Sequence, residues 1–211
     1  MNTEQEKFLA AYAVPHETIH RLSVYEKLLI EWNEKFNLVS ASTLPQIWSR
    51  HFFDSAQLLE YIPQSAKSLA DMGAGAGFPG LVLAIMAQDL GRDLHITEIE
   101  STGKKADFLQ AVVDELKLNV TIRRDRVENI RDLKPDVVTA RALKALPELL
   151  KYANYLVHKD TLCLFPKGKN AVEELTEAKK CWTFTVDIHP SRSDDSGSIL
   201  VMQELRYKTR R

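Results

Sequence analysis

The stretch DMGAGAGFPG, from Asp71 to Gly80, decides the fold. It joins two apolar runs, SLADM before it and FPGLVLAIMAQ after it, so we expect a strand, a glycine turn and a helix. Gly73, Gly75 and Gly77 lack a Cβ atom, which allows positive φ and a close approach of the backbone to a ligand. The pattern therefore predicts a ligand site at the carboxyl end of a first strand.

Beyond this turn, strand-like runs alternate with helical patterns. The runs LHITEIE, NVTIR, DVVTAR and TLCLFP are separated by segments with helical spacing, which predicts a parallel sheet covered by helices on both faces. Two final strands, near 183–188 and 198–205, have no helix between them and indicate an antiparallel hairpin at the sheet edge. The expected fold class is α/β and Rossmann-like, a mostly parallel seven-stranded sheet with an antiparallel edge strand.

The first part of the chain has a different spacing of apolar residues. Apolar residues recur at steps of three and four through residues 22–36 and 47–59, which is typical of amphipathic helices. Thr43 is expected to cap a helix over 45–61, with Pro45 in its first turn, and Pro63 ends the segment. We expect residues 1–62 to form a helical cap on the same domain and residues 63–211 to form the Rossmann-like domain.

Length and charge bound the function. A chain of 211 residues with a formal net charge of −1 fits one globular domain, and excludes a histone-like polycation, so any RNA-binding surface must be local. No stretch is apolar enough for a membrane helix and the start MNTEQEK is polar, so we expect a cytoplasmic protein without membrane contact. No apolar heptad predicts a coiled coil, which favours a monomer. Cys163 and Cys181 lie in apolar surroundings without zinc spacing, so no metal site is expected.

The glycine turn favours one ligand over another. It reads G-x-G-x-G, whereas dinucleotide sites favour G-x-G-x-x-G and place the pyrophosphate at the helix N-terminus. Asp71, just before the turn, suits a cationic ligand without phosphate, such as a methionine moiety. Gly-Lys-Ser/Thr is missing, which excludes a P-loop.

Three further strand ends carry candidate ligand contacts. Glu100, in TEIES, could accept hydrogen bonds from both hydroxyls of a ribose, with Glu98 as the reserve on the same strand face. In RRDRVEN, the Val127 amide or a carboxylate could read an adenine, although the composition alone favours a charged surface turn with internal ion pairs. Arg141, after DVVTA, either pairs with a carboxylate or holds cofactor or an RNA phosphate.

Several blocks of the sequence, in order, resemble a known family. WNEKFNLVSAS, IWSRHFFDS, DMGAGAGFPG, TEIESTGKKADFL, RVE, DVVTARAL and FPKGK are similar to the glucose-inhibited division protein B family. The resemblance implies the fold of S-adenosylmethionine methyltransferases and methyl transfer to N7 of a guanine in bacterial 16S ribosomal RNA. It implies cofactor contacts at Gly73, Gly75, Gly77, Phe78, Glu100, Val127, Glu128 and Arg141. It also implies that Arg50, His51, Asp54, Lys104, Lys105 and Lys167 face the RNA or shape its entrance.

The absence of motifs for other methylation reactions agrees with chemistry at guanine N7. Guanine N7 carries an exposed lone pair, so in-line positioning suffices and no general base is needed. The Asn/Asp-Pro-Pro-aromatic tetrapeptide of exocyclic-amine methylation is absent, and Cys163 lies inside an apolar strand pattern, unlike a covalent nucleophile. His51 and Arg141 are the positioning candidates, and a structural role for His51 stays open.

Basic residues near the expected carboxyl edge of the sheet could together attract phosphates. The candidates are Arg50, Lys104, Lys105, Arg123, Arg124, Arg126, Lys144, Lys167 and Lys169. Two other functions stay open, namely an NAD- or nucleotide-binding oxidoreductase of the same fold class and a non-enzymatic RNA-binding module. The residues do not distinguish free 16S RNA from the assembled small subunit as substrate.

Overall fold

The computed structural model describes residues 2–208, and within them seven strands form one sheet in the order β3-β2-β1-β4-β5-β7-β6. The strands are β1 (Ser68–Met72), β2 (His95–Ile99), β3 (Val120–Arg123), β4 (Val137–Thr139), β5 (Leu162–Lys167), β6 (Trp182–Pro190) and β7 (Ser198–Tyr207). Strands β1 to β5 pair in parallel, and β7 is antiparallel to both of its neighbours. The expected α/β fold class is confirmed. One detail differs from the expected antiparallel edge strand. The antiparallel strand β7 lies second from the edge, and β6 is the outermost strand.

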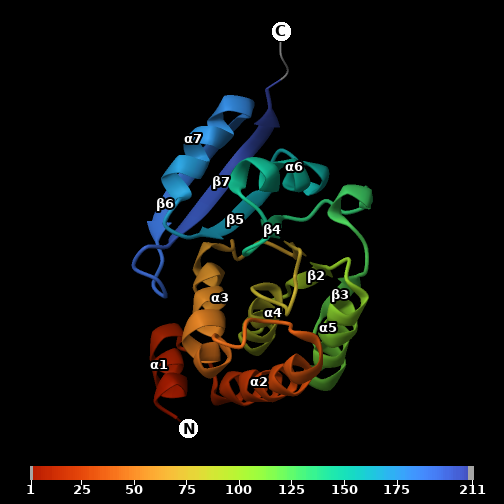
Figure 1. Ribbon diagram of the computed structural model, residues 1–211, viewed down its shortest axis with the longest axis vertical. Coiled ribbons are helices and arrows are strands. Elements are labelled where there is room, and N and C mark those ends of the chain that lie inside the picture. The colour runs from red at the N-terminus through yellow and green to blue at the C-terminus, as the bar shows by residue number, and fades with distance from the viewer. Residues whose placement is uncertain (1, 209–211) are drawn as a thin grey trace.

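Helices cover both faces of this sheet (Figure 1). Helices α4 (Gly80–Asp89) and α5 (Gly103–Leu116) pack on one face, and α6 (Leu146–Leu156) and α7 (Ala171–Cys181) pack on the other. The alternation of side chains along β5 supplies both layers, since Leu162 and Leu164 belong to the first core and Cys163 and Phe165 to the second. The carboxyl ends of the parallel strands thus meet at one rigid edge.

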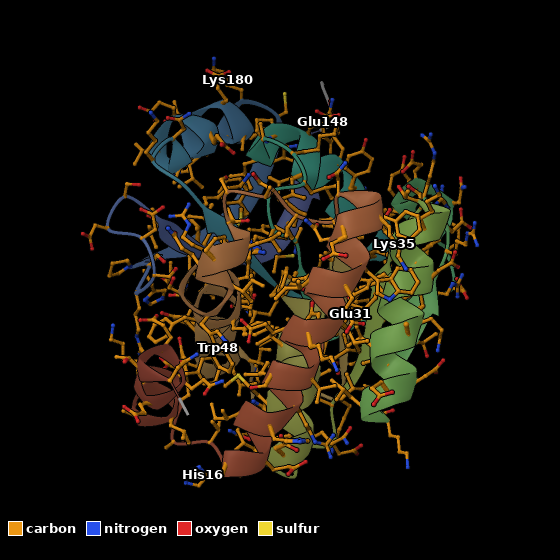
Figure 2. The ribbon with its side chains drawn as sticks, turned by 60° about the horizontal axis from the view of Figure 1, so that its bottom comes forward. His16, Glu31, Lys35, Trp48, Glu148 and Lys180 are labelled. Atoms are coloured by element: carbon orange, nitrogen blue, oxygen red, sulfur yellow. The ribbon has the colours of Figure 1, made fainter. Side chains whose placement is uncertain are left out.

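The N-terminal segment packs on α4 and α5. Its long helices are α1 (Thr3–Tyr12) and α2 (His16–Phe36), and Figure 2 shows α2 running beside α5 from His16 at one end towards Lys35 at the other. Phe8 and Leu22 lie fully buried in the same core cluster as α4. The boundary at residue 62 stays a prediction, because one continuous core joins the two parts.

The segment expected as one α-helix over 45–61 is irregular. It consists of η1 (Leu44–Gln46) in 3₁₀ form, η2 (Trp48–Phe53) in π form, α3 (Asp54–Ala56) and η3 (Gln57–Tyr61) in 3₁₀ form. The Ser55 hydroxyl donates to the His51 carbonyl at 2.7 Å, and this competition with the backbone bends helices. Thr43 does not cap the segment, because its hydroxyl donates to the Ser40 carbonyl instead.

Two smaller expectations concern the cysteines and membrane-spanning helices. Cys163 is buried, as its strand pattern predicts, whereas Cys181 is exposed at the end of α7, so its assignment to apolar surroundings was wrong. No helix within residues 2–208 is long and apolar enough to span a membrane.

Candidate active site

The glycine turn between β1 and α4 has the conformation that its residues predict. Gly73, Gly75 and Gly77 have φ values of 66°, 60° and 88°, in the left-handed region that disfavours side chains. The Gly73 and Ala74 amides donate to the Ile99 carbonyl at 2.9 and 3.1 Å, which ties the turn to the end of β2. Gly73 and Gly75 line a pocket, whereas a Cβ atom at Gly77 would collide with the underlying Leu81 side chain.

Asp71 lies beneath this turn and is fully buried. One carboxyl oxygen accepts from the Gly80 amide at 3.0 Å, and the other accepts from the Thr139 hydroxyl at 2.9 Å. Asp71 lines neither of the pockets that the turn borders. The carboxyl group holds the first residue of α4 in place and does not reach either pocket, so the expected contact with a cationic ligand stays a prediction.

Glu98 pairs with Asp71 across the β1–β2 ladder and is also fully buried. Within residues 2–208 neither of its carboxyl oxygens makes a hydrogen bond, and a Cβ atom at Gly80 would overlap the group. Burial, and then the charge of Asp71, hold the pKa of Glu98 well above its ordinary value. The structure thus removes Glu98 from the ribose role for which it was the reserve.

Glu100 has the position expected of a nucleoside-binding acid. One carboxylate oxygen accepts from the Gly75 amide at 3.0 Å and the other from the Thr102 amide at 2.7 Å. These bonds fix the carboxylate across the mouth of the glycine turn, and each oxygen keeps a second lone pair for a ligand. Sequence reasoning that preferred Glu100 to Glu98 agrees with this geometry.

A cavity of about 460 Å³ opens beside Glu100, and we call it the Glu100 pocket. It gathers candidate cofactor residues from four strand ends, namely Gly73, Glu100, Val127, Glu128 and Arg141. Sequence reasoning missed three of its other residues, Ser101, Leu143 and Tyr152. Asp125, a carboxylate of the quoted RRDRVEN loop after β3, also lines this pocket.

A second cavity, of about 470 Å³, lies on the cap side of the glycine turn, and we call it the His51 pocket. Candidate residues that line it are Arg50, His51, Asp54, Gly73, Gly75, Phe78, Lys105 and Arg141. The two pockets share Gly73, Lys105, Arg141 and Ala142, so they open towards each other around these residues. Ala142 has a φ of 53°, a strained value for an alanine, at this junction.

Arg141 is held from several sides at the junction. Its Nη1 donates to Asp54 Oδ2 at 3.0 Å and to the Arg50 carbonyl at 3.1 Å, and its Nη2 donates to His51 Nδ1 at 2.9 Å. The guanidinium lies over the Phe78 ring, 4.9 Å from its centroid. The π turn of η2 carries both Arg50 and His51 to this group, and such turns are frequent at functional sites.

His51 is fixed on both ring nitrogens. Because the guanidinium donates to Nδ1, that nitrogen is the acceptor, and Nε2 carries the hydrogen that is donated to Thr43 Oγ1 at 3.0 Å. The ring stacks on Phe78 with centroids 4.8 Å apart. Burial, followed by the charge of Arg141, lowers the pKa of His51 to about 4. His51 is therefore neutral near pH 7 and has no free lone pair to accept a proton.

The main candidates for RNA binding separate into two groups, and they are Arg50, His51, Lys104, Lys105, Arg123, Arg124 and Lys167. Arg50 and Lys105 line the His51 pocket beside His51 itself, and neither cation makes an ion pair within residues 2–208. The other four have partners of their own. Arg123 pairs with Asp132 at 2.8 Å, Arg124 with Asp107 at 3.6 Å and Lys167 with Glu174 at 2.8 Å, and Lys104 lies over the Phe36 ring.

Sequence reasoning did not identify the residues that form the remaining wall of the His51 pocket. It comes from the segment after α2 and from the loop between β6 and β7, through Leu38, Val39, Ser40, Thr43, Ser193 and Asp194. The first of these segments lies in the block WNEKFNLVSAS that carried the family resemblance, which was a usable signal. The loop over 191–197 offered none beyond its polar composition.

The family model GidB, described as rRNA small subunit methyltransferase G, matches residues 18–193. The chain belongs to this family. A protein of Rhodospirillum centenum named "Ribosomal RNA small subunit methyltransferase G" is 45% identical, over 94% of this chain and 89% of its own. A protein of the same name from Hyphomonas neptunium is 46% identical, over 96% of this chain and 95% of its own. The predicted family resemblance is confirmed.

Solved structures support the fold at low sequence identity. A mutant of MtNAS in complex with S-adenosylmethionine aligns with a TM-score of 0.57 and 15% identity, over 96% of this chain and 80% of its own. The ribosomal protein L11 methylase of Lactobacillus delbrueckii subsp. bulgaricus aligns with a TM-score of 0.56 and 14% identity, over 76% of this chain and 78% of its own. The Rossmann-like methyltransferase fold is thereby confirmed.

Proposed function

We propose that this protein transfers a methyl group from S-adenosylmethionine to N7 of a guanine in 16S ribosomal RNA. The observation that carries the proposal is the junction of the two pockets around Gly73, Lys105, Arg141 and Ala142. One pocket has the carboxylate of a nucleoside site, and the other has an aromatic ring and unpaired cations. A methyl donor and a nucleotide acceptor can therefore meet at this junction. The membership of the chain in a family of small-subunit rRNA methyltransferases supports the same activity.

The residues of the Glu100 pocket fit an adenosyl cofactor. Glu100 can accept hydrogen bonds from ribose hydroxyls, and the Val127 backbone lies beside the space that an adenine requires. Gly73 and Gly75 leave the turn without side chains at the boundary between the pockets, which suits the amino-acid end of the cofactor. When bound, S-adenosylmethionine supplies an electrophilic methyl group on a sulfonium.

The His51 pocket provides positioning rather than proton transfer. Guanine N7 attacks with an exposed lone pair, so the reaction needs alignment and a charged anchor for the RNA backbone. His51 is neutral with both nitrogens engaged, and it holds Arg141 over Phe78. Arg50 and Lys105 supply the unpaired charge for phosphates. Arg141 and His51 are thus positioning residues in this mechanism.

Nucleoside mass spectrometry of 16S ribosomal RNA, from cells with and without the gene, tests the function. We expect 7-methylguanosine to be lost with the gene and restored by the purified protein with labelled S-adenosylmethionine. Retention of every methylated nucleoside in the deletion strain would contradict the proposal. Incubation with free 16S RNA and with assembled small subunits in parallel identifies the substrate.

The alternative of an NAD-binding oxidoreductase is tested by direct binding. The chain belongs to a family of small-subunit rRNA methyltransferases, so we expect labelled S-adenosylmethionine to bind and NAD to show no saturable binding. We further propose that the protein acts in the cytoplasm, where ribosomal RNA is modified, and as a monomer. Cell fractionation and light scattering test these two points.

A further inference from the structure

The loop between β6 and β7, residues 191–197, is a wall of the His51 pocket although it follows the outermost strand of the sheet. Ser193 and Asp194 line this pocket, and Ser191 and Gly197 line an adjoining cavity of about 420 Å³ that also contains Asp194. Ser191 of the loop lies 134 residues after Gln57 of the cap in sequence, yet the two side chains are in contact.

A buried side-chain amide makes several of the hydrogen bonds in this connection. Gln57, at the start of η3, is 1% exposed. Its Oε1 accepts from the Arg192 amide at 2.9 Å, and its Nε2 lies 3.2 Å from both Ser191 Oγ and Ser193 Oγ. An amide side chain, which both donates and accepts, suits these groups together.

Asp54 extends the connection to Arg141. Its Oδ1 accepts from Ser193 Oγ at 2.6 Å and from Gln57 Nε2 at 3.1 Å, while its Oδ2 accepts from Arg141 Nη1 at 3.0 Å. Glu60, one turn further, pairs with the Arg192 guanidinium in an exposed position. The loop, the cap and the junction of the pockets therefore form one hydrogen-bonded network.

We propose that Gln57 is a positioning residue for the RNA substrate, which it serves by fixing the 191–197 loop as the wall that receives the target nucleotide. This inference rests on the proposed function. Asp194 Oδ1 accepts from the Ser196 amide and hydroxyl at 2.9 and 2.7 Å, so the turn fixes a carboxylate at the wall. A carboxylate suits the N1–H and N2–H₂ donors of guanine, and this edge of the base lies opposite N7.

The test replaces Gln57 with leucine, which keeps the bulk and removes every hydrogen bond to the loop. We expect Gln57→Leu to raise KM for small ribosomal subunits, purified from cells without the gene, by about tenfold, as the loss of one or two hydrogen bonds implies. Turnover at saturation and the Kd for S-adenosylmethionine should stay within about twofold. Amide hydrogen exchange at residues 191–197 should become faster. Gln110→Leu, the same change at an exposed position of α5, is the matched control and should alter none of these values.

A second variant keeps the test decisive if Gln57→Leu fails to fold. Ser193→Ala removes one hydroxyl of the network at the surface side and should give a smaller rise in KM of the same kind. An unchanged KM in a variant with faster loop exchange would overturn the inference. So would equal losses of turnover and cofactor affinity, which indicate a merely structural role. Absence of methyl transfer by the wild-type protein would instead overturn the proposed function itself, while the exchange data would still show whether Gln57 fixes the loop.

Discussion

The two pockets at the carboxyl edge of the sheet are built in opposite ways. The Glu100 pocket depends on backbone conformation, with glycines at positive φ and one carboxylate bonded to two amides. The His51 pocket depends on side chains that engage one another, with Arg141 held jointly by Asp54, His51 and Phe78. A substitution that changes the backbone conformation displaces every group of the turn, whereas the loss of one side chain from a network leaves its other contacts in place. We therefore expect single substitutions to damage the first pocket more than the second.

Gly75→Val should give the largest effect, the loss of measurable S-adenosylmethionine binding with the fold retained. Gly75 has a φ of 60° and its amide donates to the Glu100 carboxylate, and valine strongly disfavours this conformation. Gly91→Val is the matched control, because Gly91 has a φ of 67° in a surface turn with open space around it. Isothermal calorimetry should find normal affinity in Gly91→Val despite similar backbone strain. Normal affinity in Gly75→Val would contradict the role of this turn.

Glu100→Ala should weaken cofactor binding by about 1–3 kcal/mol, the range for hydrogen bonds to a charged group. It also frees the Gly75 and Thr102 amides, so part of the loss reflects the turn itself. Glu128→Ala, at the same pocket but paired with Arg126 at 3.6 Å, should cost less. Calorimetry on both variants compares the loss of S-adenosylmethionine affinity at the two acids. Equal losses would contradict a distinct role of Glu100 in cofactor binding.

The contrast between the pockets also explains how far the sequence predicts the site. Gly73, Gly75 and Glu100 lie at strand ends within contiguous motifs, and a parallel sheet brings its strand ends to one edge, so the Glu100 pocket was predictable. The fold class followed from the same alternation of strands and helices. The burial of Asp71 beneath the turn was not predictable, because the motif gives a position in the chain and does not give the direction in which the carboxyl group turns.

The His51 pocket was predictable only in part. The family resemblance indicated Arg50, His51 and Asp54, but the periodicity of residues 45–61 predicted a regular helix and missed the π turn that places them. Whether a lysine or arginine is free or paired depends on partners in other elements of the fold, as for Arg124 after β3 and Asp107 on α5. The local sequence pattern carries no information on such pairs. The basic candidates could therefore not be divided into paired and unpaired residues from the sequence.

His51→Ala should lower turnover by about tenfold, the effect of losing one or two hydrogen bonds that position Arg141. Because burial lowers the pKa of His51 to about 4, the imidazole does not change charge between pH 6 and 9. The pH profiles of wild type and variant should therefore have the same shape in this range. An ionisation near neutral pH that disappears in the variant would contradict the positioning role, as would a loss of several orders of magnitude with intact RNA affinity.

Glu98→Gln should change stability rather than cofactor affinity. Burial raises the pKa of Glu98, so the folded protein retains a proton that the unfolded chain releases, and stability falls as pH rises above the ordinary range of a glutamic acid. Glutamine does not titrate, so the Tm advantage of the variant should grow from pH 5 to pH 8 by a few degrees, at about 2–4 °C per kcal/mol. Glu115→Gln, an exposed replacement on α5, should show no such trend. A constant difference in Tm would mean that Glu98 is ionised in the fold.

The smallest effects are expected at the cations of the RNA side, where charge alone distinguishes the residues. Arg50→Gln and Lys105→Gln should each reduce the slope of log affinity against log salt by roughly 0.7 to 0.9, the value of one lost phosphate contact. Arg123→Gln is the matched control, because Asp132 already neutralises Arg123 at 2.8 Å. RNA binding measured by filter retention at several salt concentrations should leave the control with the wild-type slope. If Arg123→Gln lowers the slope as much as the other two, phosphates reach paired cations as well. The RNA surface would then extend past β3, and the His51 pocket would be only its centre.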